Sequence, residues 1–256
     1  MKTKDADLVL HPSDNTDGAA RIARRLRAAG WRHREEERFS PGDADTPPSQ
    51  LPAIRLYPPE HDDYFVELLI VPAGEVPGAK PWLHVELDDG WYGLPSFEFL
   101  ALTQFDRVRL GEGLSYAHPS MMALANLLSH RTLTHHLMSS PVGERTVERY
   151  AKDLGRVLAL AHLEPRAEIE RWATRWELAI RSTFPTRWPE LAGTVGAGLR
   201  ALLESDQFDE AHHCCVVGLL AGQGVSPENL RATAARLIVD AIEPMEEAGV
   251  LAGRAG

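Results

Sequence analysis

The spacing of apolar residues changes near residue 115, and this change limits the possible folds more than any other feature. Before it, short apolar segments alternate with turns rich in Pro, Gly and Asp, which is typical of strands joined by loops. After it, apolar residues recur every three or four positions, the spacing of amphipathic helices. We therefore expect an α+β protein, with a mixed sheet and flanking helices in residues 1–115 and a helical bundle in residues 116–256.

The individual elements follow from the same patterns. Strands are expected over residues 5–10, 31–39, 54–57, 64–71, 82–87, 91–94 and 107–110. A helix is expected from about residue 13 to residue 29, and a short one is possible over residues 97–102. The second half predicts helices over residues 120–130, 144–163, 166–183, 189–204, 209–221 and 227–248.

Composition excludes some classes of function. A net charge of −10 argues against coating of nucleic acid by bulk charge, although a local basic cleft remains open. No apolar run approaches the roughly 20 residues of a membrane span, and the charged N-terminus does not resemble a signal peptide. The two cysteines, Cys214 and Cys215, are adjacent and provide no disulfide framework. We expect a cytoplasmic protein without a membrane partner.

Two carboxylates, Asp5 and Asp7, alternate with apolar residues in the first predicted strand. Strand geometry puts both on one face, where their charges repel unless a cation lies between them. Hard oxygen ligands of this kind suit Mg²⁺. The pair taken alone is more typical of a strand end whose polar face meets water.

Glu67 interrupts the otherwise apolar segment 64–71. A carboxylate in a buried strand costs free energy unless it is paired or binds a metal ion. Glu67 therefore either lies on a solvated face, or pairs with an arginine, or joins Asp5 and Asp7 in a metal site of three carboxylates.

A row of cations follows one side of the predicted helix 144–163 and consists of Arg145, Arg149, Lys152 and Arg156. Such a row is usually solvated or paired with neighbouring acids, but in an acidic protein it is also a candidate binding site for a triphosphate or for a nucleic-acid backbone. Two tryptophans, Trp172 and Trp176, lie one turn apart beside arginines. These tryptophans either pack in the core or stack on nucleic-acid bases.

Together these residues resemble the nucleotidyltransferase fold of the DNA polymerase β superfamily, and most closely the abortive-infection (AbiE-type, type IV toxin–antitoxin) branch. The resemblance rests on Thr3-Lys4-Asp5-Ala6-Asp7-Leu8, on Val66-Glu67-Leu68-Leu69 and on the Arg and Lys-Asp of Arg149-Tyr150-Ala151-Lys152-Asp153. It covers about residues 1–165.

The resemblance implies a Mg²⁺-dependent nucleotidyltransferase that moves a nucleotide from an NTP to an acceptor. Asp5, Asp7 and Glu67 would be the metal ligands and catalytic residues. The nucleotide would be bound by Lys4, Arg149, Lys152, Asp153 and Arg156. RNA, such as the 3′ end of tRNA, is the favoured acceptor, and a cognate antitoxin is an expected partner. The alternative is a catalytically impaired relative that binds a protein or RNA.

The sequence departs from the family pattern at two places. The family has a Gly-Gly or Gly-Ser turn before the Asp-x-Asp strand, where backbone N–H groups bind phosphates. Met1-Lys2-Thr3-Lys4 does not contain it. Either the true start lies upstream, or the protein has lost normal nucleotide binding. In addition, Asn126 stands where relatives often have a lysine.

Overall fold

The computed structural model describes residues 5–34, 40–75, 82–111 and 113–255. It divides into two compact units, an N-terminal unit up to Ala101 and a C-terminal unit from Leu102 onward, and each is described by itself. Small sheets and a helical C-terminal region confirm the α+β class expected from the sequence. No helix in the described part of the chain is long and apolar enough to cross a membrane.

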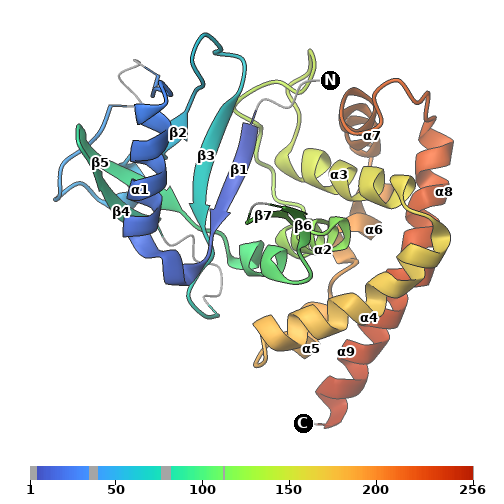
Figure 1. The fold of residues 1–256 in the computed structure, drawn as a ribbon. Helices are drawn as coiled ribbons and strands as arrows, with labels where there is room; N and C mark the ends of the chain where they lie inside the picture. Colours follow the sequence, from blue (N-terminus) through green and yellow to red (C-terminus); the bar gives the residue numbers. More distant parts are fainter. Residues whose placement is uncertain (1–4, 35–39, 76–81, 112, 256) are drawn as a thin grey trace. The chain divides into compact units, whose positions relative to one another are not determined.

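The N-terminal unit is built on a three-stranded sheet in the order β1-β3-β2. Strand β1 (Asp5–Leu10) runs parallel to β3 (Phe65–Ile70), and β2 (Arg55–Leu56) runs antiparallel to β3. Helix α1 (Asn15–Ala28) follows β1 after the 3₁₀ turn η1 (Pro12–Asp14), and Figure 1 shows it in blue beside the sheet. Strands β4 (Trp82–Leu87) and β5 (Gly90–Pro95) form an antiparallel hairpin.

The core of this unit lies on one face of the β1-β3-β2 sheet. Every second residue of β1 and β3 packs there, so that Leu10, Leu68 and Ile70 are buried. They meet small residues of α1 and apolar residues of the β4–β5 hairpin, which are Ala19, Ala20, Ala23, Val85, Leu87, Tyr92 and Leu94. Because side chains alternate along a strand, Asp7 and Glu67 belong to the opposite face of this sheet.

The C-terminal unit begins within the 3₁₀ helix η4 (Glu98–Gln104) and continues into the hairpin of β6 (Val108–Gly111) and β7 (Leu114–Tyr116). Helices follow to the end of the description. They are α2 (Pro119–Ser129), α3 (Arg149–Leu163), α4 (Arg166–Thr183), α5 (Trp188–Gly193), α6 (Ala197–Glu204), α7 (Phe208–Val217), α8 (Pro227–Leu237), the π-helix η5 (Ile238–Ile242) and α9 (Glu243–Ala255).

Aromatic residues and close helix contacts hold this unit together. Trp172 and Trp176 are fully buried, and the indole N–H of Trp176 donates to the carbonyl oxygen of Ser120 at 2.9 Å. Core packing of the two tryptophans is therefore confirmed, and base stacking on them is excluded. At Gly155 of α3, an added Cβ would lie 2.7 Å from the carbonyl oxygen of Ala211 in α7, so this contact requires glycine.

Several expected elements differ from the structure. Residues 144–148 are not helical, because this segment forms backbone bridges such as Leu137 to Glu148, and α3 begins only at Arg149. The expected helix 189–204 breaks between α5 and α6. Residues 31–34 form only a single bridge, from Arg32 to Tyr57, instead of the start of a strand, while residues 35–39 lie outside the description.

Candidate functional site

The strand register brings two of the sequence-predicted site residues side by side. In the parallel pair β1–β3, Asp7 is the Cα partner of Glu67. Partners in register point to the same face of a sheet, and neighbouring strands lie about 4.8 Å apart. Asp7 is exposed, whereas the Glu67 side chain is only 14% exposed. The sheet thus places two carboxylates together on the face opposite the core.

An arginine completes this row across the sheet. Arg55 of β2 is the antiparallel partner of Glu67, and its guanidinium lies 3.2 Å from the Glu67 carboxylate. The same guanidinium lies over the ring of Phe65, 5.3 Å from its centroid. Pairing of Glu67 with an arginine, one of the alternatives open from the sequence, is therefore present. Sequence reasoning did not select Arg55, although it is the single charged residue of the short segment 54–57.

Two described carboxylates on this face of the sheet are suitable ligands for a divalent cation. Carboxylate oxygens of Asp7 and Glu67 are hard ligands that suit Mg²⁺. Asp5 occupies the strand position two residues before Asp7, in register with Phe65, but its side chain lies outside the description, as does all of Lys4. Among the described residues, no group of three or more His, Cys, Asp or Glu side chains is arranged to hold a metal ion.

In the C-terminal unit, the predicted nucleotide-binding residues surround a buried carboxylate. Asp153 of α3 is 5% exposed. Its oxygen Oδ2 accepts hydrogen bonds from His130 at 2.9 Å and from Arg149 at 3.1 Å, and Arg156 lies 4.0 Å from Oδ1. Lys152, which precedes Asp153 on α3, is partly buried. We call Asp153 together with His130, Arg149 and Arg156 the Asp153 cluster.

These contacts set the ionisation of Asp153. Burial alone would raise the pKa of its carboxyl, but the hydrogen bond from His130 and the charges of Arg149 and Arg156 lower it to about 2. The carboxylate is therefore charged at neutral pH and fixes the orientation of the cations around it. Of the predicted row, Arg145 lies before α3 and is absent from the helix, while Arg149, Lys152 and Arg156 lie on it.

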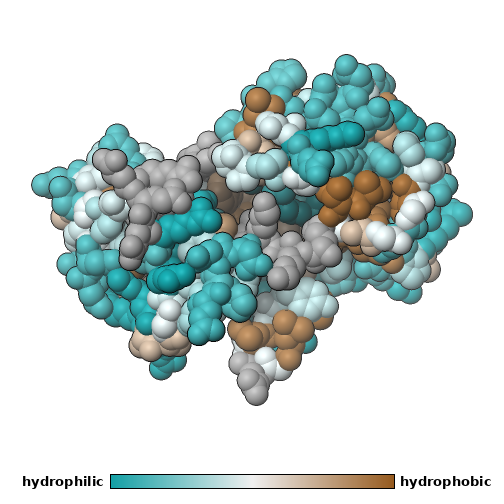
Figure 2. All heavy atoms as spheres, turned by 90° about the horizontal axis from the view of Figure 1, so that it is seen from above, coloured by the Kyte–Doolittle hydropathy of each residue, from teal (hydrophilic) through white to brown (hydrophobic). Residues whose placement is uncertain are grey.

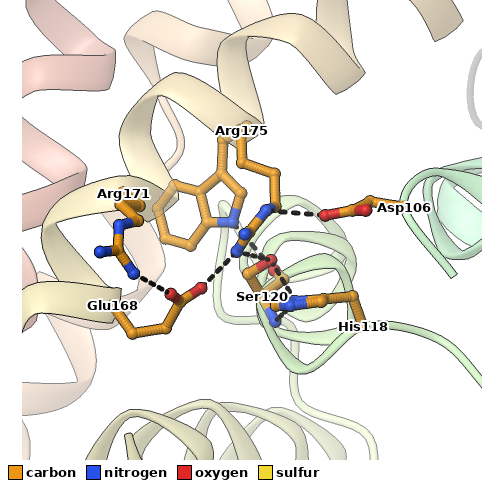
Figure 3. Close-up of polar contacts among 7 residues, drawn as sticks. Asp106, His118, Ser120, Glu168, Arg171 and Arg175 are labelled. Atoms are coloured by element: carbon orange, nitrogen blue, oxygen red, sulfur yellow. Dashed lines mark hydrogen bonds and ion pairs between the residues drawn. The ribbon is translucent and has the colours of Figure 1, made fainter. Parts of the chain in front are cut away.

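A second polar network in the C-terminal unit was not predicted from the sequence (Figure 3). Its centre is Arg175 of α4, which contacts Asp106 at 2.9 Å and Glu168 at 2.6 Å. Ser120 is fully buried, and its hydroxyl lies 2.8 Å from Nδ1 of His118, which caps α2. Burial and then the charge of Arg175 lower the pKa of His118. Because Ser120 is inaccessible, this network ties α2 to α4 and offers no nucleophile.

The paired histidines and cysteines of α7 have structural partners. His212 contacts the carbonyl oxygen of Val225 at 2.8 Å, and His213 that of Val142 at 2.9 Å. Cys214 and Cys215 are buried, and burial raises the pKa of the Cys215 thiol to about 12. In comparison with known proteins, no family model, curated sequence or solved structure matches this chain.

Proposed function

We propose that the chain is a Mg²⁺-dependent nucleotidyltransferase that uses the carboxylate face of the β1-β3-β2 sheet. The observation that carries the proposal is the register of Asp7 with Glu67, since two carboxylates held side by side favour a divalent cation between them. The resemblance of residues 1–165 to the DNA polymerase β superfamily supports the same assignment.

In this proposal each residue has a separate task. Asp7 and Glu67, with Asp5 from the adjoining strand position, would hold Mg²⁺, which supplies charge neutralisation at the triphosphate and lowers the pKa of the attacking hydroxyl. Arg55 holds the Glu67 carboxylate in one orientation through their 3.2 Å contact. The rigid strands β1 and β3 fix the spacing of the carboxylates, which is what in-line transfer requires of them.

The resemblance alone assigns the cations of α3 to the phosphates. Arg149 is half exposed, and its guanidinium is oriented by Asp153, so that its remaining donors are available to an anion. Arg156 is oriented by the same carboxylate. Lys152 adds a third positive charge. We assign an NTP as the donor and RNA, such as tRNA, as the acceptor. A cytoplasmic location, a cognate antitoxin and the type IV toxin branch belong to the same proposal.

The direct test measures transfer by the full chain. Purified protein is incubated with each α-labelled NTP, Mg²⁺ and total RNA, and label in RNA is quantified. Asp7→Ala should lower the rate by about 100-fold or more, because it removes a ligand of the ion that stabilises the transition state. Asp45→Ala, which removes an exposed carboxylate from a loop of the same unit, should leave the rate unchanged.

Two outcomes would contradict the assignment: no labelling by the wild type with any NTP, or equal labelling by wild type and Asp7→Ala. In the second case the activity would not depend on the carboxylate face.

One observation favours a second candidate function, a non-catalytic protein that binds a protein or RNA. The Arg55–Glu67 pair neutralises Glu67 without a metal ion. For this candidate, calorimetry should detect no Mg²⁺ binding by the wild type, and Glu67→Gln should leave partner binding unchanged. Mg²⁺ binding that is lost in both Asp7→Ala and Glu67→Gln favours the enzyme instead.

A further inference from the structure

Helix α9 of the C-terminal unit exposes two apolar side chains on its outer side. Its inner side packs on α5, where a Cβ added to Gly249 would lie 2.6 Å from the backbone nitrogen of Gly193. On the outer side, Val250 and Leu251 are 46% and 67% exposed. On the face shown in Figure 2, hydrophobic residues form small groups within a mainly hydrophilic surface. Two exposed apolar residues alone are ordinary, so their neighbours decide what this side of α9 can bind.

An acid and a base flank these two apolar residues. Glu247 and Arg254 are both exposed, and neither side chain has an ion pair or hydrogen bond with a residue that the structure describes. They do not pair with each other, because seven residues of helix separate them by about 10 Å along the axis. The neighbouring Glu246 differs, since its carboxylate accepts hydrogen bonds from Arg200 at 2.7 and 2.8 Å. Glu247 and Arg254 are therefore available to a partner.

The spacing of these four residues makes the outer side of α9 complementary to itself. Glu247 stands three positions before Val250, and Arg254 stands three positions after Leu251. At 3.6 residues per turn, all four lie within about 100° of arc, on the side away from Gly249. A second α9 that runs antiparallel, with a twofold axis between positions 250 and 251, places Val250 opposite Leu251 and Glu247 opposite Arg254. Because a twofold contact repeats each pairing, one interface would contain two such ion pairs.

An open hollow lies along the same side of the helix. Its volume is about 440 Å³, and it is lined by Glu243, Glu246, Glu247, Val250 and Leu251. It has room for the Leu251 and Arg254 side chains of a second copy, and its acidic wall suits a guanidinium group. A basic peptide would use the acidic residues but would leave Arg254 without a partner. A second copy uses both charges, so charge complementarity selects it.

We propose that the chain associates with a second copy of itself through antiparallel α9 helices, with Val250 and Leu251 at the centre and a Glu247–Arg254 ion pair at each end. Exposed ion pairs contribute little free energy, so the apolar centre stabilises the dimer and the charges set its direction. One helix face offers less area than the roughly 1,600 Å² of a standard interface, so the dimer should be weak and form at high protein concentration. It does not depend on the nucleotidyltransferase assignment.

Sedimentation equilibrium of the full chain, between about 5 and 500 µM, measures the association. The mass of the wild type should rise from one chain toward two and stop there, because a twofold contact closes on itself. Leu251→Gln keeps a good helix former at an exposed position and should weaken dimerisation by about tenfold or more, since each dimer loses two leucine contacts. Thermal unfolding of each variant checks that the fold is kept.

Charge reversal tests the direction of the two helices. Glu247→Arg and Arg254→Glu should each weaken dimerisation by about tenfold, because each turns two attractive pairs into repulsive ones. The double variant Glu247→Arg/Arg254→Glu should associate within about threefold of the wild type, since the charges have only changed places. In a parallel pair Glu247 would face its own copy, and neither reversal would weaken association. Glu144→Arg makes the same charge change in an exposed turn of this unit, and as the control it should alter affinity by less than about twofold.

Four results would overturn the proposal. The first is a wild type that stays a monomer at every concentration, which is the outcome expected if α9 binds a different protein. The second is a mass that grows beyond two chains. The third is a single charge reversal that leaves the affinity unchanged, or a double variant that associates no better than the single ones. The fourth is an equal loss of affinity in Glu144→Arg.

Discussion

Asp153 and Glu67 are both carboxylates set among apolar residues, and arginine offsets the cost of each. Asp153 is the more buried of the two and contacts His130, Arg149 and Arg156, whereas Glu67 has Arg55 across the sheet. Burial disfavours the ionised form of a carboxylate, and its cationic partners favour it. At Asp153 the partners prevail, so its protonation should weaken the fold.

This gives a prediction for Asp153. The pKa of its carboxyl is lowered to about 2 from an ordinary value near 3.8, so its stabilising effect is present above pH 3.8 and is lost as the pH falls through about 2. The difference in free energy of unfolding between wild type and Asp153→Asn should be about 2 kcal/mol larger at pH 6 than at pH 2. Urea unfolding at several pH values measures it. A difference independent of pH would contradict the ionised cluster.

At the scale of single elements, α3 is shaped by contact with α7. Gly155 lies on α3, and the Sγ–H of Cys215 donates to its carbonyl oxygen at 3.0 Å. The two backbones approach closely because Gly155 has no side chain. A larger residue would push α7 away or strain α3.

We therefore expect Gly155→Ala to destabilise the protein by about 1–3 kcal/mol, although alanine is the better helix former by about 1 kcal/mol. Gly193→Ala is the matched control, because a Cβ added at this residue of α5 meets nothing within 4 Å. It should be neutral or stabilising by up to about 1 kcal/mol. Thermal and urea unfolding compare the two variants. Equal effects of both substitutions would show that the close approach at Gly155 is not essential.

Local patterns were sufficient to predict many elements. The bounds of β1 and α4 agree with the sequence, since alternating residues and a long 3.6-residue period identify them directly. The break between α5 and α6 was missed, although Gly196 marks it, because a glycine within a helical pattern is often tolerated. A His-Pro-Ser sequence begins both α2 and the turn η1 that leads into α1, with the histidine Nδ1 accepting from the serine N–H at 3.2 Å, and it was not recognised as a repeat.

Only those features of the candidate site that depend on neighbouring residues in the sequence could be predicted. The period of two that puts Asp7 on one strand face can be read from sequence, whereas its pairing with Glu67 depends on a register between strands about 60 residues apart. The partners Arg55 and His130 were not assigned because contacts between distant segments follow from tertiary packing. The burial of Asp153 was hidden for the same reason.

For the whole molecule, the important feature is that each unit has a hydrophobic core of its own. Leu68 is fully buried in the core of the N-terminal unit, between the sheet and α1. Leu158 of α3 is fully buried in the C-terminal unit. A region with its own core can unfold as a separate cooperative unit. Damage to one core should then be confined to the residues of that unit.

Paired core substitutions test this independence. Leu68→Ala and Leu158→Ala should each cost about 2–5 kcal/mol, because both remove a fully buried side chain. Hydrogen exchange measured by mass spectrometry should show lost protection in peptides of residues 5–101 for Leu68→Ala, and in those of residues 102–255 for Leu158→Ala. Each variant serves as the control for the other. If either variant reduces protection throughout the chain, the two units unfold as one. A substitution in either unit that changes activity would then require a stability measurement before a catalytic role is assigned to the residue.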